Sequence, residues 1–120
     1  MTTAILRTPR ADQQRTYNEV EFAATSLGVR IAAYVAPDAR GTFRGLPVML
    51  PSDLSALGVD LVVAPTSLLA EDVTPFIEAG WPAERLLSFA TQQAEVRERW
   101  GADSGGLAWR RHRRTAGVAT

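Results

Sequence analysis

Two short apolar runs of the sequence are each followed by residues that could line a ligand site. These residues are Thr8, Arg10 and Asp12 after the first run, and Pro65, Thr66 and Ser67 after the second. If both runs are neighbouring parallel strands, the two groups meet at the carboxyl edge of the sheet, where doubly wound folds bind ligands. Thr66 and Ser67 would also begin a helix, whose free N–H groups attract an anion. The alternative is that one of them only caps this helix and that Arg10 is solvated.

A second candidate site is the charged turn around Asp38. Its carboxylate is suited to accept a hydrogen bond from a ribose or sugar hydroxyl, and Arg40 and Arg44 lie close by in the sequence to contact a phosphate. The alternative is an ordinary charged turn between two strands, and we favour that interpretation.

The basic residues of the C-terminal end form a third candidate. Trp109 and His112 lie among Arg110, Arg111, Arg113 and Arg114. Residues 1–100 hold 9 Arg and 12 acidic residues, net −3, whereas residues 101–120 hold 4 Arg and 1 acidic residue, net +3. Arg side chains beside an aromatic ring suit nucleic acid or another anionic partner. The run is short and no other segment is basic, so we expect a flexible, solubilising tail and consider nucleic acid unfavoured.

Composition excludes several classes of chemistry. All 13 basic residues are Arg, and there is no Cys and only one His. A P-loop or Schiff-base Lys, a thiol nucleophile, a disulfide and a multi-His metal site are therefore impossible for this sequence. Glu71 and Asp72 are adjacent, so on a helix their carboxylates diverge and do not form an acid–base pair. We expect no metal site.

The apolar pattern predicts alternating strands and helices. Strands are expected at residues 4–8, 30–35, 45–50, 60–64 and 85–89, and helices at 15–27, 53–57, 66–79 and 92–100. Within residues 66–79, Thr74-Pro75 indicates a fresh helix start, since Pro is favoured at the first helical position. Pro47 favours an edge position for its strand, because it cannot donate a ladder hydrogen bond. The neighbouring buried strands should carry Ile5, Ile31, Val62 and Leu87.

This order of elements predicts a small doubly wound, mostly parallel α/β sheet of about five strands, a Rossmann-like domain over residues 1–100. Residues 101–120 would form the tail. Trp81 and Trp100 pack in the core or mediate association, and the sequence does not decide between these roles.

Residues 28–90 resemble a family of Rossmann-like domains in bacterial polysaccharide and sugar-nucleotide enzymes. The similarity rests on Gly45-Leu46-Pro47-Val48, Ser52-Asp53-Leu54, Asp60-Leu61-Val62-Val63-Ala64 and Gly80-Trp81-Pro82-Ala83-Glu84-Arg85-Leu86-Leu87. The family includes the N-terminal domains of sugar acetyltransferases and the leading domains of sugar-nucleotide dehydratases. The resemblance implies binding of a nucleotide or a nucleotide sugar.

The sequence departs from this family at two places. The turn after the first strand, residues 8–14, contains no Gly, so its backbone is kept away from a pyrophosphate, although Arg7, Arg10 and Arg15 still reach an anion by side chain. Ala36-Pro37 stands where the family has acidic residues, and Asp38 follows two positions late.

Three functions follow as hypotheses. The first is a stand-alone accessory protein that binds a nucleotide or nucleotide sugar, the second a small enzyme or enzyme subunit in sugar-nucleotide or natural-product biosynthesis, and the third an assembly module that has lost its ligand. Partners would be a biosynthetic enzyme or further copies of the chain. No apolar run reaches the roughly 20 residues that span a bilayer, and residues 1–10 lack the apolar stretch of a secretory signal, so we expect a cytoplasmic, non-membrane protein.

Overall fold

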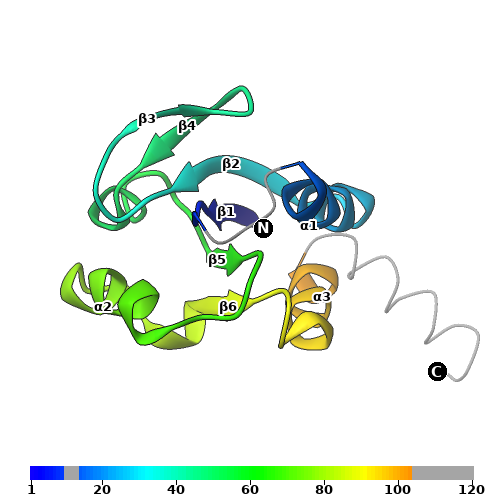
Figure 1. The fold of residues 1–120 in the computed structure, drawn as a ribbon. Helices are drawn as coiled ribbons and strands as arrows, with labels where there is room; N and C mark the ends of the chain where they lie inside the picture. The colour runs from blue at the N-terminus through cyan, green and yellow to red at the C-terminus, as the bar shows by residue number, and fades with distance from the viewer. Residues whose placement is uncertain (10–13, 104–120) are drawn as a thin grey trace, which may run out of the picture.

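The computed structural model describes residues 1–9 and 14–103. Arg10 and Asp12, and the basic segment that includes Arg110, Arg111, Arg113 and Arg114, lie outside the described residues. The described residues form a sheet, its helices and the turns between them (Figure 1).

Six strands form one mostly parallel sheet, which confirms the doubly wound α/β prediction. In chain order they are β1 (Thr2–Leu6), β2 (Arg30–Val35), β3 (Gly41–Phe43), β4 (Leu46–Met49), β5 (Leu61–Ala64) and β6 (Leu86–Ser88). Their order across the sheet is β3-β4-β2-β1-β5-β6, and only β3 runs antiparallel to its neighbour. Ile5, Val62 and Leu87 are buried and Ile31 is partly buried, on four adjacent strands as predicted.

Helices cover both faces of the sheet, as right-handed crossovers require. Figure 1 shows α1 (Arg15–Ser26) and α3 (Gln93–Asp103) on one face, and α2 (Ala70–Glu78) with the short 3₁₀ turn η1 (Pro51–Asp53) on the other. A second 3₁₀ turn, η2 (Ala83–Arg85), leads into β6. Side chains alternate between two apolar clusters, so that Ile5 packs under α1 and α3 while Leu6 packs toward α2. Within the described residues the longest helix, α1, has 12 residues, which is too short to cross a bilayer.

The prediction missed strand β3, which forms a hairpin with β4. Arg44 and Gly45 make its two-residue turn with φ of 52° and 82°, the positive values that two-residue hairpins need. The edge position expected from Pro47 is therefore wrong, because β3 lies outside β4. Pro47 is tolerated there because β4 pairs with β2 only from Val48 onward.

The helix predicted from Thr66 begins instead at Ala70. The Asp72 carboxylate accepts the Leu69 N–H at 2.8 Å, which fixes the start of α2 one turn later than predicted. Thr66 and Ser67 therefore cap no helix. The predicted break at Thr74-Pro75 is also wrong, since α2 runs through Pro75 and the Thr74 hydroxyl donates to the Ala70 carbonyl at 2.9 Å.

Both tryptophans that the sequence left undecided belong to the core. Trp100 is fully buried, and its indole N–H donates to the Thr3 hydroxyl at 2.9 Å, which ties α3 to the first strand. The indole N–H of Trp81 donates to the Arg85 carbonyl at 2.9 Å. The helix that carries Trp100 continues through Gly101 to Asp103, beyond the predicted end.

We predict that Val62→Asp unfolds the domain. Val62 is fully buried in β5, and an unpaired charge there costs several kcal/mol, a large part of the roughly 5–15 kcal/mol that stabilises a domain. Circular dichroism should show no cooperative melting transition. Ile77→Asp, at a 53% exposed position of α2, is the matched control and should melt like the parent. A soluble Val62→Asp protein with a cooperative transition would contradict the core placement.

Candidate ligand site at the carboxyl edge of the sheet

Strands β2, β1 and β5 lie side by side and end at the same edge of the sheet. Leu6 at the end of β1 is in register with Val35 at the end of β2, and Ile5 is in register with Val63 of β5. The chain proceeds from β1 to one side of the sheet and later returns to the other, so the switch point lies between β1 and β5. Thr8, Asp38, Thr66 and Ser67 all follow strands that end there.

The turn after β1 is closed by Tyr17 from the first turn of α1. The Thr8 N–H donates to the Tyr17 hydroxyl at 3.0 Å, and that hydroxyl donates back to the Thr8 carbonyl at 3.2 Å. Both side chains are buried, and the next residue, Pro9, has no N–H. The backbone donor that would meet a phosphate in a glycine-rich turn is therefore already bonded within the protein.

Tyr17 keeps its proton at neutral pH. Burial raises the pKa of its hydroxyl, and the hydrogen bond with Thr8 and the nearby Arg7 and Arg44 only partly oppose this effect. The hydroxyl can therefore donate to the Thr8 carbonyl throughout the physiological range.

Arg7 directly follows β1 and is exposed. Its backbone N–H donates to the Val35 carbonyl at 2.8 Å, which continues the pairing of β1 with β2. Its guanidinium carbon lies 4.5 Å from the ring centre of Phe43, a cation–π contact. This guanidinium donates no hydrogen bond to any described residue. Its N–H groups therefore remain available to a ligand.

The Phe43 ring belongs to a cluster of three aromatic rings. Tyr17, Tyr34 and Phe43 pack edge to face, with ring centres 5.5 Å, 5.2 Å and 4.9 Å apart. This geometry is the favoured one for aromatic pairs. The rings come from α1, β2 and β3, so they join the helix to the hairpin across the end of the sheet.

An ion pair clamps the hairpin onto α1. The Arg44 guanidinium contacts the Glu21 carboxylate at 3.0 Å and 3.2 Å, and it also donates to the Asn18 side chain. The Tyr34 hydroxyl donates to the same carboxylate. Burial alone would raise the pKa of Glu21, but the hydrogen bonds from Arg44 and Tyr34 outweigh it and hold this pKa below its ordinary value. Burial, together with the Glu21 carboxylate, raises the pKa of Tyr34.

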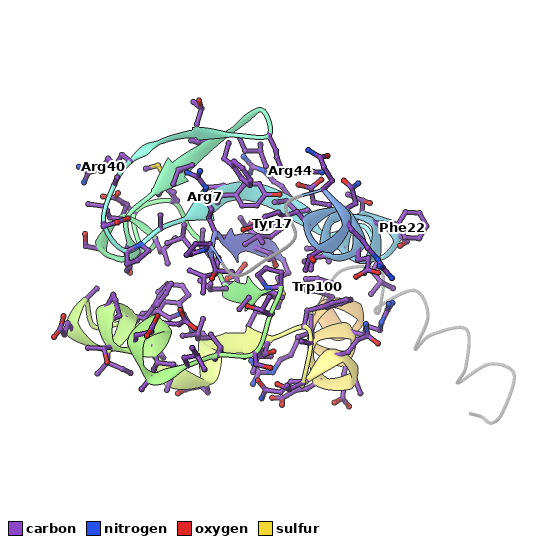
Figure 2. All side chains as sticks on the ribbon, in the orientation of Figure 1. Arg7, Tyr17, Phe22, Arg40, Arg44 and Trp100 are labelled. Carbon is purple, nitrogen blue, oxygen red and sulfur yellow. The ribbon has the colours of Figure 1, made fainter. Side chains whose placement is uncertain are left out.

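The arginines that the sequence grouped with Asp38 are both engaged elsewhere. Arg40 makes a two-pronged ion pair with Asp53 at 3.0 Å and 2.9 Å, and Arg44 holds Glu21. Figure 2 shows Arg40 on the far side of the hairpin from Arg44, while Arg7 and Tyr17 lie between the hairpin and α1. Asp38 itself is exposed and makes no ion pair with a described residue.

The other half of the edge is formed by the turns after β5 and β6. The Ser88 hydroxyl donates to the Thr66 carbonyl at 2.9 Å and accepts the Thr91 N–H at 3.1 Å. The Thr66 hydroxyl oxygen is buried and has no hydrogen-bond partner among the described residues, whereas Ser67 is exposed. Buried hydroxyls are normally hydrogen-bonded, so the Thr66 hydroxyl is an exception at the end of β5. In residues 1–9 and 14–103, no three Asp, Glu or His side chains gather closely enough to hold a metal ion.

Comparison with protein-family models gave no match, and neither did comparison with curated proteins. The described structure is compatible with a Rossmann-like fold. The relation to sugar-nucleotide enzymes therefore stays a resemblance of sequence pattern.

The closed turn predicts weak binding of NAD and NADP. Neither Thr8 nor Pro9 offers a backbone donor to a pyrophosphate, so we expect no dissociation constant below about 1 mM, which is roughly −4 kcal/mol. Isothermal titration calorimetry with both dinucleotides measures this directly. Micromolar binding of either one would contradict this prediction.

The Glu21 clamp predicts an acid-sensitive contribution to stability. Because the pKa of Glu21 in the folded state lies below its ordinary value of 4.5, the clamp stabilises the fold at higher pH and is lost as the pH falls through the folded-state pKa. Glu21→Gln should cost about 1–2 kcal/mol at pH 7 and flatten the dependence of stability on pH between about 5 and 3.

Urea unfolding at a series of pH values measures this contribution. The matched control is Glu78→Gln, which removes an exposed carboxylate at the end of α2. Equal slopes against pH for Glu21→Gln and the parent would contradict the clamp.

Proposed function

We propose that this domain binds a small phosphorylated, hydroxyl-bearing molecule of the nucleotide or nucleotide-sugar class at the carboxyl edge of β2, β1 and β5, and that it acts as an accessory protein. The observation that carries the proposal is the Arg7 guanidinium, which lies on the Phe43 ring at the end of β1 with its N–H groups unused by the described residues.

Arg7 supplies the kind of anion contact that the closed turn no longer offers. A guanidinium is permanently charged and presents its N–H donors in one plane, in a geometry that matches two phosphate oxygens. Its position after the central strand β1 is the place where doubly wound folds meet their ligands. The Arg7 guanidinium, and not the Thr8 N–H, would therefore donate hydrogen bonds to the phosphate.

Asp38 and Thr66 supply groups for the hydroxylated part of the ligand. Asp38 follows β2, on one side of Arg7, and its exposed carboxylate can accept hydrogen bonds from a pair of sugar hydroxyls. Thr66 follows β5, on the other side, with its buried hydroxyl oxygen unpartnered among the described residues. The resemblance to sugar-nucleotide domains gives an acidic residue after the second strand this same role.

The chemistry of these groups favours binding over catalysis. Among the described residues, neither the Thr66 nor the Ser67 hydroxyl is hydrogen-bonded to a base that would activate it as a nucleophile. The only His, His112, lies outside the described residues. The enzyme hypothesis predicts turnover that Asp38→Ala or Ser67→Ala removes, which separates it from the accessory-protein hypothesis.

One observation favours the assembly-module hypothesis as a second candidate. The Tyr17 hydroxyl occupies the Thr8 N–H, a backbone donor that could otherwise meet a ligand phosphate, as expected for a domain that has given up that ligand. A chain of this kind would bind neither phosphate esters nor nucleotide sugars.

The proposal is tested by the effect of Arg7→Ala on ligand binding. The probes are UMP, UDP-glucose and glucose 1-phosphate, first in a thermal-shift screen and then by calorimetry. We expect at least one probe to bind, and Arg7→Ala to weaken it tenfold or more, because charge-assisted hydrogen bonds contribute about 1.5–3 kcal/mol.

The matched control is Arg30→Ala, which removes an exposed guanidinium from the start of β2, at the opposite edge of the sheet. It should leave the affinity unchanged. Failure of all three probes to bind, or equal affinity of Arg7→Ala and the parent, would overturn the proposal; the first result would favour the assembly module.

A further inference from the structure

We infer that Phe43 is a positioning residue for Arg7, so that the β3–β4 hairpin forms part of the ligand site. This inference rests on the proposed function, because it concerns how the same guanidinium is held. The contact joins distant parts of the fold: Arg7 follows the central strand β1, whereas Phe43 ends the edge strand β3, with β4 and β2 between them.

The geometry of the contact leaves the hydrogen-bonding capacity of Arg7 intact. The guanidinium carbon lies 4.5 Å from the ring centre, and the guanidinium donates no hydrogen bond to a described residue. A guanidinium that stacks on a ring in this way uses its face for the contact and keeps its N–H donors in the plane for a ligand. An exposed arginine without such a contact moves among many rotamers, and a ligand would have to immobilise it on binding.

The Phe43 ring is itself held before any ligand arrives. It packs edge to face on Tyr17 and Tyr34, whose rings are fully buried. The next residue, Arg44, is fixed to Glu21 of α1. Arg44 also accepts a positive φ of 52°, which non-Gly residues seldom adopt, to make this turn. The hairpin is thus anchored on α1 on one side and supports Arg7 on the other.

This arrangement also gives the closed turn a second consequence. The Tyr17 ring that supports Phe43 carries the hydroxyl that bonds to Thr8. Tyr17, which accepts the Thr8 N–H, therefore belongs to the same aromatic cluster that holds the Arg7 guanidinium. A ligand at this edge would be recognised through a single fixed guanidinium, which suits one phosphate group better than a pyrophosphate cradled by backbone.

The experiment compares three replacements of Phe43. Phe43→Tyr keeps an aromatic face, whereas Phe43→Leu and Phe43→Met are apolar without one. The side-chain Nε–Hε signal of Arg7, assigned by its loss in Arg7→Ala, is followed by NMR without ligand and during titration with inorganic phosphate and UDP-glucose. The matched control is Phe22→Leu, which removes a phenyl ring that is 75% exposed on α1.

We expect the ligand-free Arg7 signal to carry a ring-current shift in the parent, in Phe43→Tyr and in Phe22→Leu, and to lose it in Phe43→Leu and Phe43→Met. Phosphate and UDP-glucose affinity should fall about five- to tenfold in the two variants without a ring and stay within about twofold of the parent in the other two. Phe43→Met, which is closer in volume, provides the comparison if Phe43→Leu does not fold.

Other results would overturn the inference in recognisable ways. Parent-like affinity in a folded Phe43→Leu or Phe43→Met protein, while Arg7→Ala loses binding, would refute the role of Phe43 and leave the proposed function standing. Weakened binding in Phe43→Tyr equal to that in Phe43→Leu would show a packing role only. Absence of binding of UMP, UDP-glucose and glucose 1-phosphate by the parent would refute both proposals.

Discussion

The two hydrogen bonds between the Tyr17 hydroxyl and the backbone of Thr8 determine what the carboxyl edge of this sheet can bind. In a doubly wound domain, the turn after the first strand usually meets a phosphate through backbone N–H groups. Here the Thr8 N–H is bonded to a fully buried side chain. A ligand that took over the Thr8 N–H would break its bond with the buried Tyr17 hydroxyl, and a lost buried hydrogen bond costs about 1–3 kcal/mol. Among the described residues that follow β1, Thr8 and Pro9 therefore offer no backbone donor to an anion, and Arg7 offers its guanidinium.

The same tyrosine links the turn to the hairpin. Its ring packs on Tyr34 and Phe43, and the Glu21–Arg44 ion pair closes the unit from the surface. This packed unit lies on the α1 face of the sheet, at the hairpin end. The β3–β4 hairpin is therefore held against α1. This places Phe43 of the hairpin in contact with Arg7, which follows the central strand β1.

The alternation of strands and helices and the mostly parallel sheet could be predicted because apolar runs bounded by glycine and proline repeat along the chain. Strand β3 could not, because Gly41, Thr42 and Phe43 have no apolar pattern and pair only through the turn at Arg44 and Gly45. The start of α2 depended on the Asp72 carboxylate, which overrode the equally suitable Thr66. The sequence indicated that Thr8 and Thr66 follow strands ending at one edge, whereas it placed Asp38 in a separate charged turn; the register of β2 with β1 brings Asp38 to the same edge. The contacts of Arg7 with Phe43 and of Arg44 with Glu21 carry no such signal, because they join residues far apart in the chain.

The choice of an aromatic ring, and not a carboxylate, as the partner of Arg7 has an electrostatic consequence. Arg40 and Arg44 are held by Asp53 and Glu21, so each of their charges is largely neutralised where it lies. A ring holds a guanidinium through its quadrupole and leaves the net charge of the cation in place. A phosphate that approached Arg40 or Arg44 would have to compete with a carboxylate already bound in two-pronged geometry and would meet its repulsion. A phosphate that approached Arg7 would meet an ordered cation with no bound carboxylate to displace and none to repel it. Order and uncompensated charge together make residue 7, among these three arginines, the one suited to an anionic ligand.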